Sequence, residues 1–229
     1  MKQQRLLRLE KLIGEKNIEK LQASTVMLVG LGGVGGTAFE ALLRSGIGHF
    51  ILIDSESFDE TNLNRQILCT RATIGKLKTE VAKERAMSID ENIIVETFPV
   101  FADETNILSL LDKNPSVVVD AIDSVPSKVF LLSSCVKREI PVVSSMGAGL
   151  RVDPTLVRIS DIGQTFCDPL AKEVRRRLKE EEILSGIKCV FSTEKPKEKV
   201  GAIIASSCTV TSTFGNALAQ AAIDTLLQN

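Results

Sequence analysis

The run of glycines at residues 30–36 constrains the fold more than any other feature of this sequence. The residues before it, TVMLVG (25–30), form a short apolar run typical of a strand buried on both faces of a parallel sheet. The residues that follow, from Gly32 to Gly46, have the pattern of a helix with small residues at its start. A buried strand joined to a helix through a tight glycine turn is the opening unit of a doubly wound α/β fold.

The alternation of strand and helix patterns continues well beyond this first unit. Four further strands are expected at residues 49–54, 92–100, 116–123 and 140–146. Strands that alternate with helices predict a Rossmann-like, doubly wound and mostly parallel sheet with helices on both faces.

The pattern changes after Gly147, where an antiparallel C-terminal extension is expected. The expected elements are a hairpin at 150–162 that turns at Asp153 and Pro154, a charged helix at 168–182, a strand at 189–194, a lysine-rich loop at 195–199 and a helix from about 203 to 227. The small residues of the last helix suit close packing, including a subunit contact. Because no repeat or linker divides the chain, residues 1–229 are expected to form one domain.

Composition excludes several classes of function. His49 is the only histidine and stands at the start of an apolar strand, so histidine-based acid–base or triad catalysis is not expected. The five cysteines include no C-x-x-C pair, which argues against a disulfide framework and against a zinc site. The formal net charge is −1, so a nucleic-acid partner would need a local basic patch.

The N-terminus and the hydropathy of the chain indicate where the protein would be found. The opening MKQQRLLRLEKLIGEK alternates charged and apolar residues, unlike a signal peptide. No stretch reaches the roughly 18 apolar residues that a membrane span needs. A cytoplasmic protein without a membrane partner is therefore expected.

The glycine pattern also predicts a nucleotide site. Gly30, Gly32 and Gly35 form G-x-G-x-x-G between strand and helix, where backbone amides and the helix N-terminus favour phosphate. Asp54 ends the next expected strand, nineteen residues after Gly35, the separation expected of an acid that binds a ribose hydroxyl. A nicotinamide-dependent oxidoreductase is one interpretation, although no acid–base group for hydride transfer is recognisable.

A polar segment beyond Asp54 favours a different chemistry. Within five positions it contains Asn62, Asn64, Arg65 and Gln66, and Lys78 follows. An arginine and a lysine that converge on phosphates would neutralise the charge of a leaving pyrophosphate. The alternative is a solvated loop followed by a helix.

Five motifs together resemble the E1-like family of ThiF, MoeB and HesA proteins. In order they are GLGGVG (which includes Gly33), Asp54, NLNRQ, GKLK and DAIDS. The resemblance implies an enzyme that uses ATP to adenylate a carboxylate. Asp54 would hold the ribose, Asn62, Arg65 and Lys78 would hold the phosphates, and Asn64 and Gln66 belong to the same motif.

The resemblance also implies a metal ion and a second subunit. Asp123, in DAIDS, matches the family acid that works with Mg²⁺ and the reacting phosphate. Asp120 of the same motif is interpreted as a turn or strand-end residue. Arg8, in RLLR, matches an N-terminal arginine that reaches the ATP of the partner subunit, which implies a homodimer.

The second half of the chain is similar to the tRNA threonylcarbamoyladenosine dehydratases. The matching segments are GAGLRVDPTLVRISDI, QTFCDPLAKEVRRRLK, CVFSTE and TSTFGNALA. This resemblance implies adenylation of the threonylcarbamoyl carboxylate on an anticodon-loop adenosine (position 37 of tRNA), followed by ring closure with net loss of water. Alternatives are a sulfur-carrier or ubiquitin-like protein adenylyltransferase, to which a sulfur-relay partner would belong, and a non-catalytic binding subunit.

The helix expected at 168–182 is the candidate tRNA-binding element. Its cations at three- and four-residue spacing form one stripe, consisting of Lys172, Arg175, Arg176 and Lys179. Such a stripe could lie against phosphate. Alternatively, this is a solvated helix whose cations are balanced by Glu173, Glu180, Glu181 and Glu182, with Glu173 and Arg177 paired.

Two cysteines are candidate nucleophiles for an activator that forms a thioester. Cys189 stands in an apolar strand and Cys208 among small residues of an expected helix, where cysteine is commonly buried. A structural role is therefore expected for both.

Overall fold

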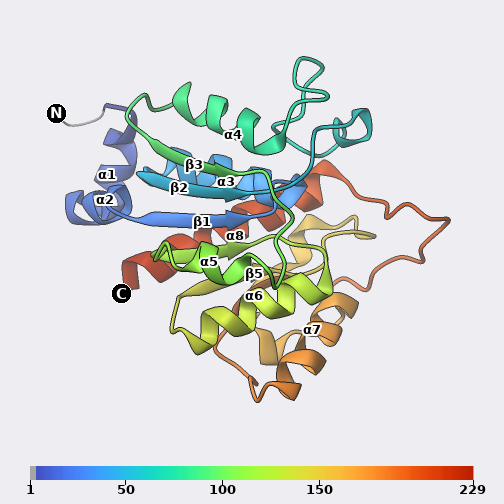
Figure 1. Ribbon diagram of the computed structural model, residues 1–229. Coiled ribbons are helices and arrows are strands. Elements are labelled where there is room, and N and C mark those ends of the chain that lie inside the picture. The colour runs from blue at the N-terminus through green and yellow to red at the C-terminus, as the bar shows by residue number, and fades with distance from the viewer. Residues whose placement is uncertain (1–3, 229) are drawn as a thin grey trace.

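The computed structural model describes residues 4–228 as one sheet covered by helices on both faces (Figure 1). The strands are β1 (Thr25–Val29), β2 (His49–Ile53), β3 (Ile94–Phe98), β4 (Val117–Asp120), β5 (Val142–Ser145), β6 (Val157–Asp161) and β7 (Lys188–Ser192). The α-helices are α1 (Leu7–Ile13), α2 (Glu15–Gln22), α3 (Gly33–Arg44), α4 (Lys78–Met87), α5 (Ile107–Leu111), α6 (Val125–Lys137), α7 (Pro169–Glu180) and α8 (Cys208–Gln228). Short 3-10 turns are η1 (Gln4–Leu6), η2 (Glu60–Asn62), η3 (Pro154–Leu156) and η4 (Ile162–Gln164).

The sheet has the topology that the alternating pattern predicts. Its seven strands lie in the order β3-β2-β1-β4-β5-β7-β6, and every neighbouring pair is parallel except β6 with β7. The order reverses direction at β1 and β4, and the carboxyl ends of these two strands are where an open α/β sheet binds its ligand. The prediction of a Rossmann-like, mostly parallel sheet with an antiparallel extension is confirmed.

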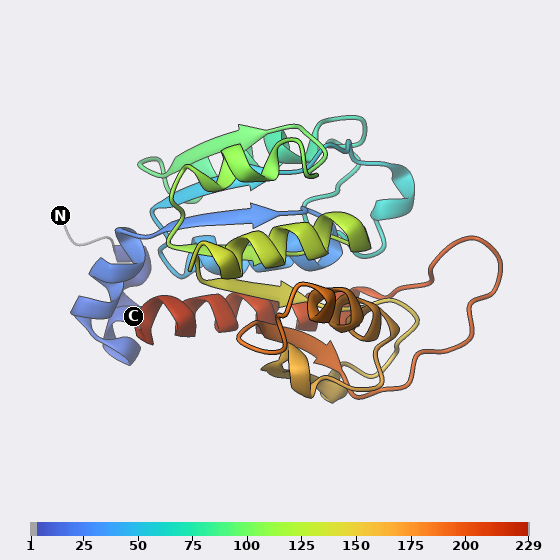
Figure 2. The same cartoon turned by 60° about the horizontal axis from the view of Figure 1, so that its bottom comes forward.

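Two apolar layers hold the helices to the sheet, because successive side chains of a strand point to opposite faces. Val26 and Leu28 of β1 pack in the layer that includes α3 and α8, whereas Met27 and Val29 pack in the layer that includes α5, α6 and α7. Figure 2 shows α8 running behind the sheet, on the face opposite α6. Burial on both faces explains why the central strands are continuously apolar.

Helix α8 crosses α3 at close range, as its small residues predict. A Cβ atom on Gly215 would lie 2.6 Å from the Thr37 Cβ and 2.6 Å from the Val34 carbonyl oxygen. Such an approach leaves no room for a side chain at this position. The subunit contact expected for the same helix stays a prediction.

The expected hairpin at 150–162 is wrong. Residues 150–152 are not a strand, and β6 pairs instead with β7, which begins at Lys188. The backbone amides of Val152 and Asp153 donate to the Glu194 carboxylate, and the Asp153 carboxylate accepts from the Thr155 amide (2.8 Å) to start η3. The backbone amides before Pro154 therefore bond to a carboxylate and not to a neighbouring strand.

The last helix also begins later than expected, at Cys208. Residues 193–207 form a long connection that projects beyond the carboxyl edge of the sheet (Figure 2). Its base is held by two backbone hydrogen bonds of 2.8 Å, from Leu150 to the Ala205 carbonyl and from Lys197 to the Leu150 carbonyl. Because the Ala205 carbonyl oxygen accepts from the Leu150 amide, it does not take part in the hydrogen bonds of α8.

His49, the first residue of β2, lies close to two polar side chains. Its ring lies 3.2 Å from the Thr25 hydroxyl and 3.0 Å from the Glu96 carboxylate at the amino end of β2. Within residues 4–228, no helix is both long and apolar enough to cross a membrane.

Candidate nucleotide-binding site

The glycine loop follows β1 at the carboxyl edge of the sheet. Gly30 has a φ of +93°, and a Cβ there would lie 2.7 Å from the Ala121 carbonyl oxygen. A Cβ on Gly35, in the first turn of α3, would lie 1.8 Å from the Gly30 carbonyl oxygen. Both glycines are therefore required by the tight turn, which exposes the first amides of α3 at the edge where phosphate would bind.

The Asp54 carboxylate lies directly against this loop. It accepts hydrogen bonds from the Leu31 amide (2.6 Å) and the Glu56 amide (2.8 Å). Burial raises the pKa of this carboxyl, and the two backbone hydrogen bonds and the nearby Lys78 only partly oppose that effect. An acid that follows β2 and touches the glycine loop is placed as a ribose-binding residue would be.

The polar segment 62–66 also lies beside the glycine loop, where three parts of the chain meet. The Arg65 carbonyl oxygen would be 3.2 Å from a Cβ on Gly33, and so would the Thr211 Cβ of α8. The side-chain Nδ2 of Asn64 donates to the Ser206 carbonyl oxygen (3.1 Å). Segment 62–66, the glycine loop and the start of α8 therefore border one region.

Within the segment, the four polar side chains have different environments. Asn62 is buried and accepts from the Asp59 amide (3.1 Å), so it stabilises η2. The half-buried Arg65 donates to the Thr61 carbonyl and to the Asn64 side chain (both 2.9 Å). Gln66 is buried, and its side-chain oxygen has no hydrogen-bond partner among the described residues. Such an atom is costly unless a ligand or water satisfies it.

Lys78 is the first residue of α4 and is almost completely buried, although it is a lysine. Its Nζ lies 2.5 Å from Glu56 Oε2 and 5.9 Å from the centre of the Phe58 ring. Glu56, whose side chain is 70% exposed, was not singled out from the sequence. Its position two residues after the strand-ending acid is the only sequence signal for it.

Asp123 lies on the loop between β4 and α6, next to the glycine loop. Its side chain is exposed, and Ala121 of the same loop touches Gly30. The carboxyl ends of β1, β2 and β4 thus bring the glycine loop, Asp54 and Asp123 to one edge of the sheet. Among residues 4–228, no group of three or more His, Cys, Asp or Glu side chains is placed to hold a metal ion.

A family model of the ThiF family matches residues 3–229. The chain belongs to the ThiF family. It is 41% identical over 184 residues to tRNA threonylcarbamoyladenosine dehydratase of Bacillus subtilis, with 80% of this chain and 72% of that protein covered. The dehydratase of Escherichia coli is 39% identical over 191 residues, which cover 80% of this chain and 71% of that protein.

Solved structures agree with this membership. The E. coli tRNA N6-threonylcarbamoyladenosine dehydratase in complex with AMP matches with a TM-score of 0.94 and 36% identity, over 98% of this chain and 95% of that one. The ATP complex of the same enzyme matches with a TM-score of 0.92. The E. coli MccB structure with ATP is only 21% identical, with a TM-score of 0.67, and shares the fold.

In this ThiF-family chain, a buried ion pair supports the loop that bears Asp123. Asp120 and Lys128 are both completely buried, with Lys128 Nζ 2.5 Å from Asp120 Oδ2. The Ser144 hydroxyl donates to the same carboxylate (2.6 Å), and the Ile122 amide donates to its other oxygen (3.0 Å). Asp120 is a strand-end residue, as predicted. Lys128 was missed, because a lysine in a helix pattern normally indicates a solvated face.

A second buried ion pair orders the loops after β5. Arg151, 3% exposed, lies 3.2 Å from Asp168 and donates to the carbonyl oxygens of Gly147, Gly149 and Glu194. Asp168 also accepts from the Gly147 amide (3.1 Å) and begins α7. Asp168 is the first residue of the charged helix expected at 168–182, whereas no local pattern in the sequence indicates a role for Arg151.

The remaining candidates lie elsewhere. Arg8 is exposed on α1, at the amino edge of the sheet and away from the glycine loop (Figure 1). Within one chain it does not join the site.

Cys189 is buried, as expected, but Cys208 is exposed at the start of α8, so the expectation of burial was wrong for Cys208. It is the long connection before α8 that leaves Cys208 at the surface.

Helix α7 presents its cations unevenly. Arg176 pairs with Glu173 (2.8 Å) and Glu180 (2.5 Å), and Arg177 pairs with Glu173 (2.8 Å) as the sequence analysis predicted. Lys172 and Lys179 have neither an ion pair nor a hydrogen bond with any side chain in residues 4–228. The stripe thus contains both neutralised and free cations.

Proposed function

We propose that this chain is an ATP-dependent tRNA threonylcarbamoyladenosine dehydratase. The observation that supports it best is the meeting of the glycine loop, Asp54, segment 62–66 and the Asp123 loop at one edge of the sheet. The chain is also similar over 98% of its length to a dehydratase solved with AMP.

The residues at this edge suit ATP. The amides at the start of α3 would hold phosphate, and Asp54 would accept a ribose hydroxyl. Arg65 would hold phosphate as a cation, and Gln66 has a buried oxygen in need of a donor. For Lys78 to bind phosphate, it must exchange the exposed carboxylate of Glu56 for a phosphate oxygen, which costs little because Glu56 returns to water.

The reaction has two steps. The threonylcarbamoyl carboxylate attacks the α-phosphorus of ATP, and the bond between the α- and β-phosphates breaks to release pyrophosphate. The same side chain then attacks the activated carbonyl, closes a ring and releases AMP, which retains one oxygen of the former carboxylate. Fixed cations such as Arg65 and Lys78 would stabilise the charge that develops on the leaving pyrophosphate.

A magnesium ion is part of the proposal. Asp123 would hold Mg²⁺ together with the phosphates, because carboxylate oxygens are its usual protein ligands. The ion would neutralise phosphate charge. The exposed position of Asp123 beside the glycine loop leaves it free for this role.

The proposal extends to the assembly and its surroundings. Arg8 would complete the site of a second copy, which makes the protein a homodimer of single-domain chains. The stripe of α7 (Lys172, Arg175, Arg176 and Lys179) would hold tRNA phosphates, and the cytoplasm would supply both tRNA and ATP. A sulfur-relay protein is a further candidate partner.

ATP–pyrophosphate exchange tests the proposal. We expect exchange with tRNA that carries N6-threonylcarbamoyladenosine, no exchange with the unmodified transcript, and loss of activity in EDTA. Asp123→Ala should abolish exchange without unfolding the protein. Exchange driven instead by a carrier protein with a C-terminal Gly-Gly would contradict the proposal and favour the protein adenylyltransferase.

A further inference from the structure

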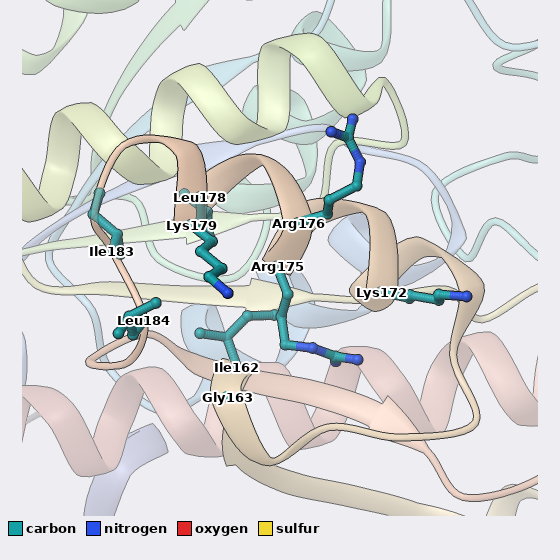
Figure 3. Close-up of a pocket in the computed structure, with 9 residues that line it drawn as sticks. All are labelled: Ile162, Gly163, Lys172, Arg175, Arg176, Leu178, Lys179, Ile183 and Leu184. Atoms are coloured by element: carbon teal, nitrogen blue, oxygen red, sulfur yellow. The ribbon is translucent and has the colours of Figure 1, made fainter.

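A cavity of about 300 Å³ lies beside α7, apart from the nucleotide-binding site. It is formed by α7, η4 and the residues that lead from α7 to β7 (Figure 3). Its lining residues are Ile162, Gly163, Lys172, Arg175, Arg176, Leu178, Lys179, Ile183 and Leu184.

All charged side chains that line this cavity are positive. Four of the lining side chains are cationic and none is acidic. The nearby Asp161 carboxylate is bound to the Gly163 amide (2.8 Å) and the Gly186 amide (2.6 Å), and Glu181 pairs with Lys137. Glu182, exposed beside Ile183, is the nearby acid whose side chain has no hydrogen bond or ion pair within residues 4–228, and it does not line the cavity. Because every charged lining side chain is cationic, an anion is the ligand that the cavity favours.

Three of the four cations are available to such an anion. Lys172 and Lys179 are exposed and have no carboxylate partner within residues 4–228. Arg175 donates to the Thr165 hydroxyl, which orients its guanidinium and leaves further donors free. Arg176 is already paired with Glu173 and Glu180, and in Figure 3 it points away from Ile162. Arg175 and Lys179 point towards Ile162, whereas Lys172 lies nearer the start of α7 and points away from Lys179.

The rest of the lining is apolar. Ile162, Leu178 and Ile183 are buried, and Leu184 is 64% exposed at the mouth. An inorganic anion would gain nothing from this wall. A nucleotide would, because its base or ribose can cover apolar surface while its phosphate meets the cations.

The cavity lies away from the glycine loop. Helix α7 starts at the carboxyl edge, where Asp168 meets the Gly147 amide, and runs towards the other edge of the sheet. Residues 183–187 precede β7, whose first residue Lys188 pairs with Val143 near the start of β5. A ligand that occupies both this cavity and the nucleotide-binding site must therefore be a macromolecule, and tRNA is the macromolecular substrate of the proposed function.

We propose that this cavity is an RNA exosite that holds one nucleotide of the tRNA outside the modified anticodon-loop position. Arg175 and Lys179 bind its phosphate, Lys172 binds the adjacent phosphate of the same strand, and Leu184 with Ile162 and Ile183 covers its base or ribose. This inference rests on the proposed function, since it takes tRNA as the substrate.

The test compares three variants of the full chain in tRNA binding and ATP turnover. Lys172→Gln/Lys179→Gln removes two cations of the cavity, and Lys16→Gln/Lys83→Gln removes two exposed lysines from α2 and α4 as a charge-matched control. Leu184→Ser removes the exposed apolar wall without a change in charge. All five positions are exposed, so the fold should be retained.

The cavity variant should bind tRNA about tenfold more weakly at 0.1 M salt, with a log–log salt slope flatter by about 1.4 to 1.8. Leu184→Ser should weaken binding with an unchanged slope. Both should raise KM for tRNA while kcat and ATP affinity stay at wild-type values, and the control should resemble wild type.

Two kinds of failure are distinguishable. If the wild-type protein consumes no ATP with modified tRNA, the proposed function fails. If wild type is active, either of two outcomes overturns the exosite: an unchanged salt slope in the cavity variant, or wild-type affinity in Leu184→Ser. The same loss in the control as in the cavity variant also overturns it.

Discussion

Lys128 shows how much one buried side chain can matter at the residue scale. It is completely buried, and it joins the Asp120 carboxylate to the Ser145 carbonyl oxygen (3.0 Å) between β4 and β5. Asp120 in turn holds the Ile122 amide, one residue before Asp123. The ion pair therefore fixes the geometry of the loop that borders the glycine turn.

We expect Lys128→Met to lower the free energy of unfolding by about 3 to 5 kcal/mol, because it leaves the Asp120 charge buried without a partner. Urea denaturation would measure the loss. The double variant Asp120→Asn/Lys128→Met removes both charges and should recover much of it. A single variant as stable as wild type would contradict this account.

The glycines of the loop differ in what a methyl group would meet. A Cβ on Gly35 meets the Gly30 carbonyl oxygen, whereas a Cβ on Gly32 has no neighbour within 4 Å, and Gly32 has a φ of −71°. The fold itself therefore excludes a side chain at Gly35, whereas at Gly32 only a bound ligand would exclude one.

Gly35→Ala should therefore destabilise the protein by about 1 to 3 kcal/mol or more, since backbone must move. Gly32→Ala should keep its melting temperature but bind ATP more weakly, because its methyl group would stand where phosphate approaches. Thermal denaturation and calorimetric titration with ATP would separate the two effects. Equal thermal destabilisation by both substitutions would argue against the stated geometry.

At the scale of elements, the start of α7 depends on residues far apart in the sequence. Asp168 accepts from the Ala171 amide (3.0 Å) as an N-cap and also pairs with the buried Arg151. Arg151 holds the loop after β5 through three carbonyl oxygens. One carboxylate thus joins the helix to the carboxyl edge of the sheet.

Asp168→Ala should cost about 3 to 5 kcal/mol in unfolding free energy, because the Arg151 charge would lose its partner and α7 its cap. Asp153→Ala is the matched control, since Asp153 begins η3 at the surface without a buried partner. The control should have a much smaller effect in urea denaturation. Comparable losses would show that capping, and not the buried pair, is responsible.

At the scale of the whole molecule, one chain contains most of the proposed site but not Arg8. Helix α1 lies at the amino edge of the sheet, whereas the glycine loop, Asp54 and Asp123 lie at the carboxyl edge (Figure 1). An arginine there can act on ATP only in a second copy. The proposed homodimer would then share each site between two chains.

A mixing experiment tests this arrangement. Arg8→Ala and Asp54→Asn should each abolish adenylation alone. Random hybrids of the two should restore about a quarter of wild-type activity, because half the dimers are mixed and each has one intact site. Size-exclusion chromatography would verify the dimers. A mixture no more active than its components would place Arg8 outside the partner's site.

The parts of the fold that the sequence determined by itself are those set by neighbours along the chain. The alternation of apolar strands and helices predicted the parallel sheet, because burial on both faces requires continuous apolar runs. The glycine turn and Asp54 followed from spacing alone, since a strand, a tight turn and a helix are adjacent in sequence. Their contact is now seen in the hydrogen bond from the Leu31 amide to Asp54.

The features that only the tertiary structure decided depend on partners distant in sequence. Residues 150–162 have the local pattern of a hairpin, yet β6 pairs with β7, and Glu194 binds the backbone amides before the turn. Lys128 has the pattern of a solvated lysine, yet Asp120 and Ser144 surround it. Arg176 and Lys179 belong to one stripe, yet acids neutralise only Arg176. Ion pairing, burial and strand pairing depend on which residues lie close together in space. The periodicity of a sequence does not show which distant segments come into contact.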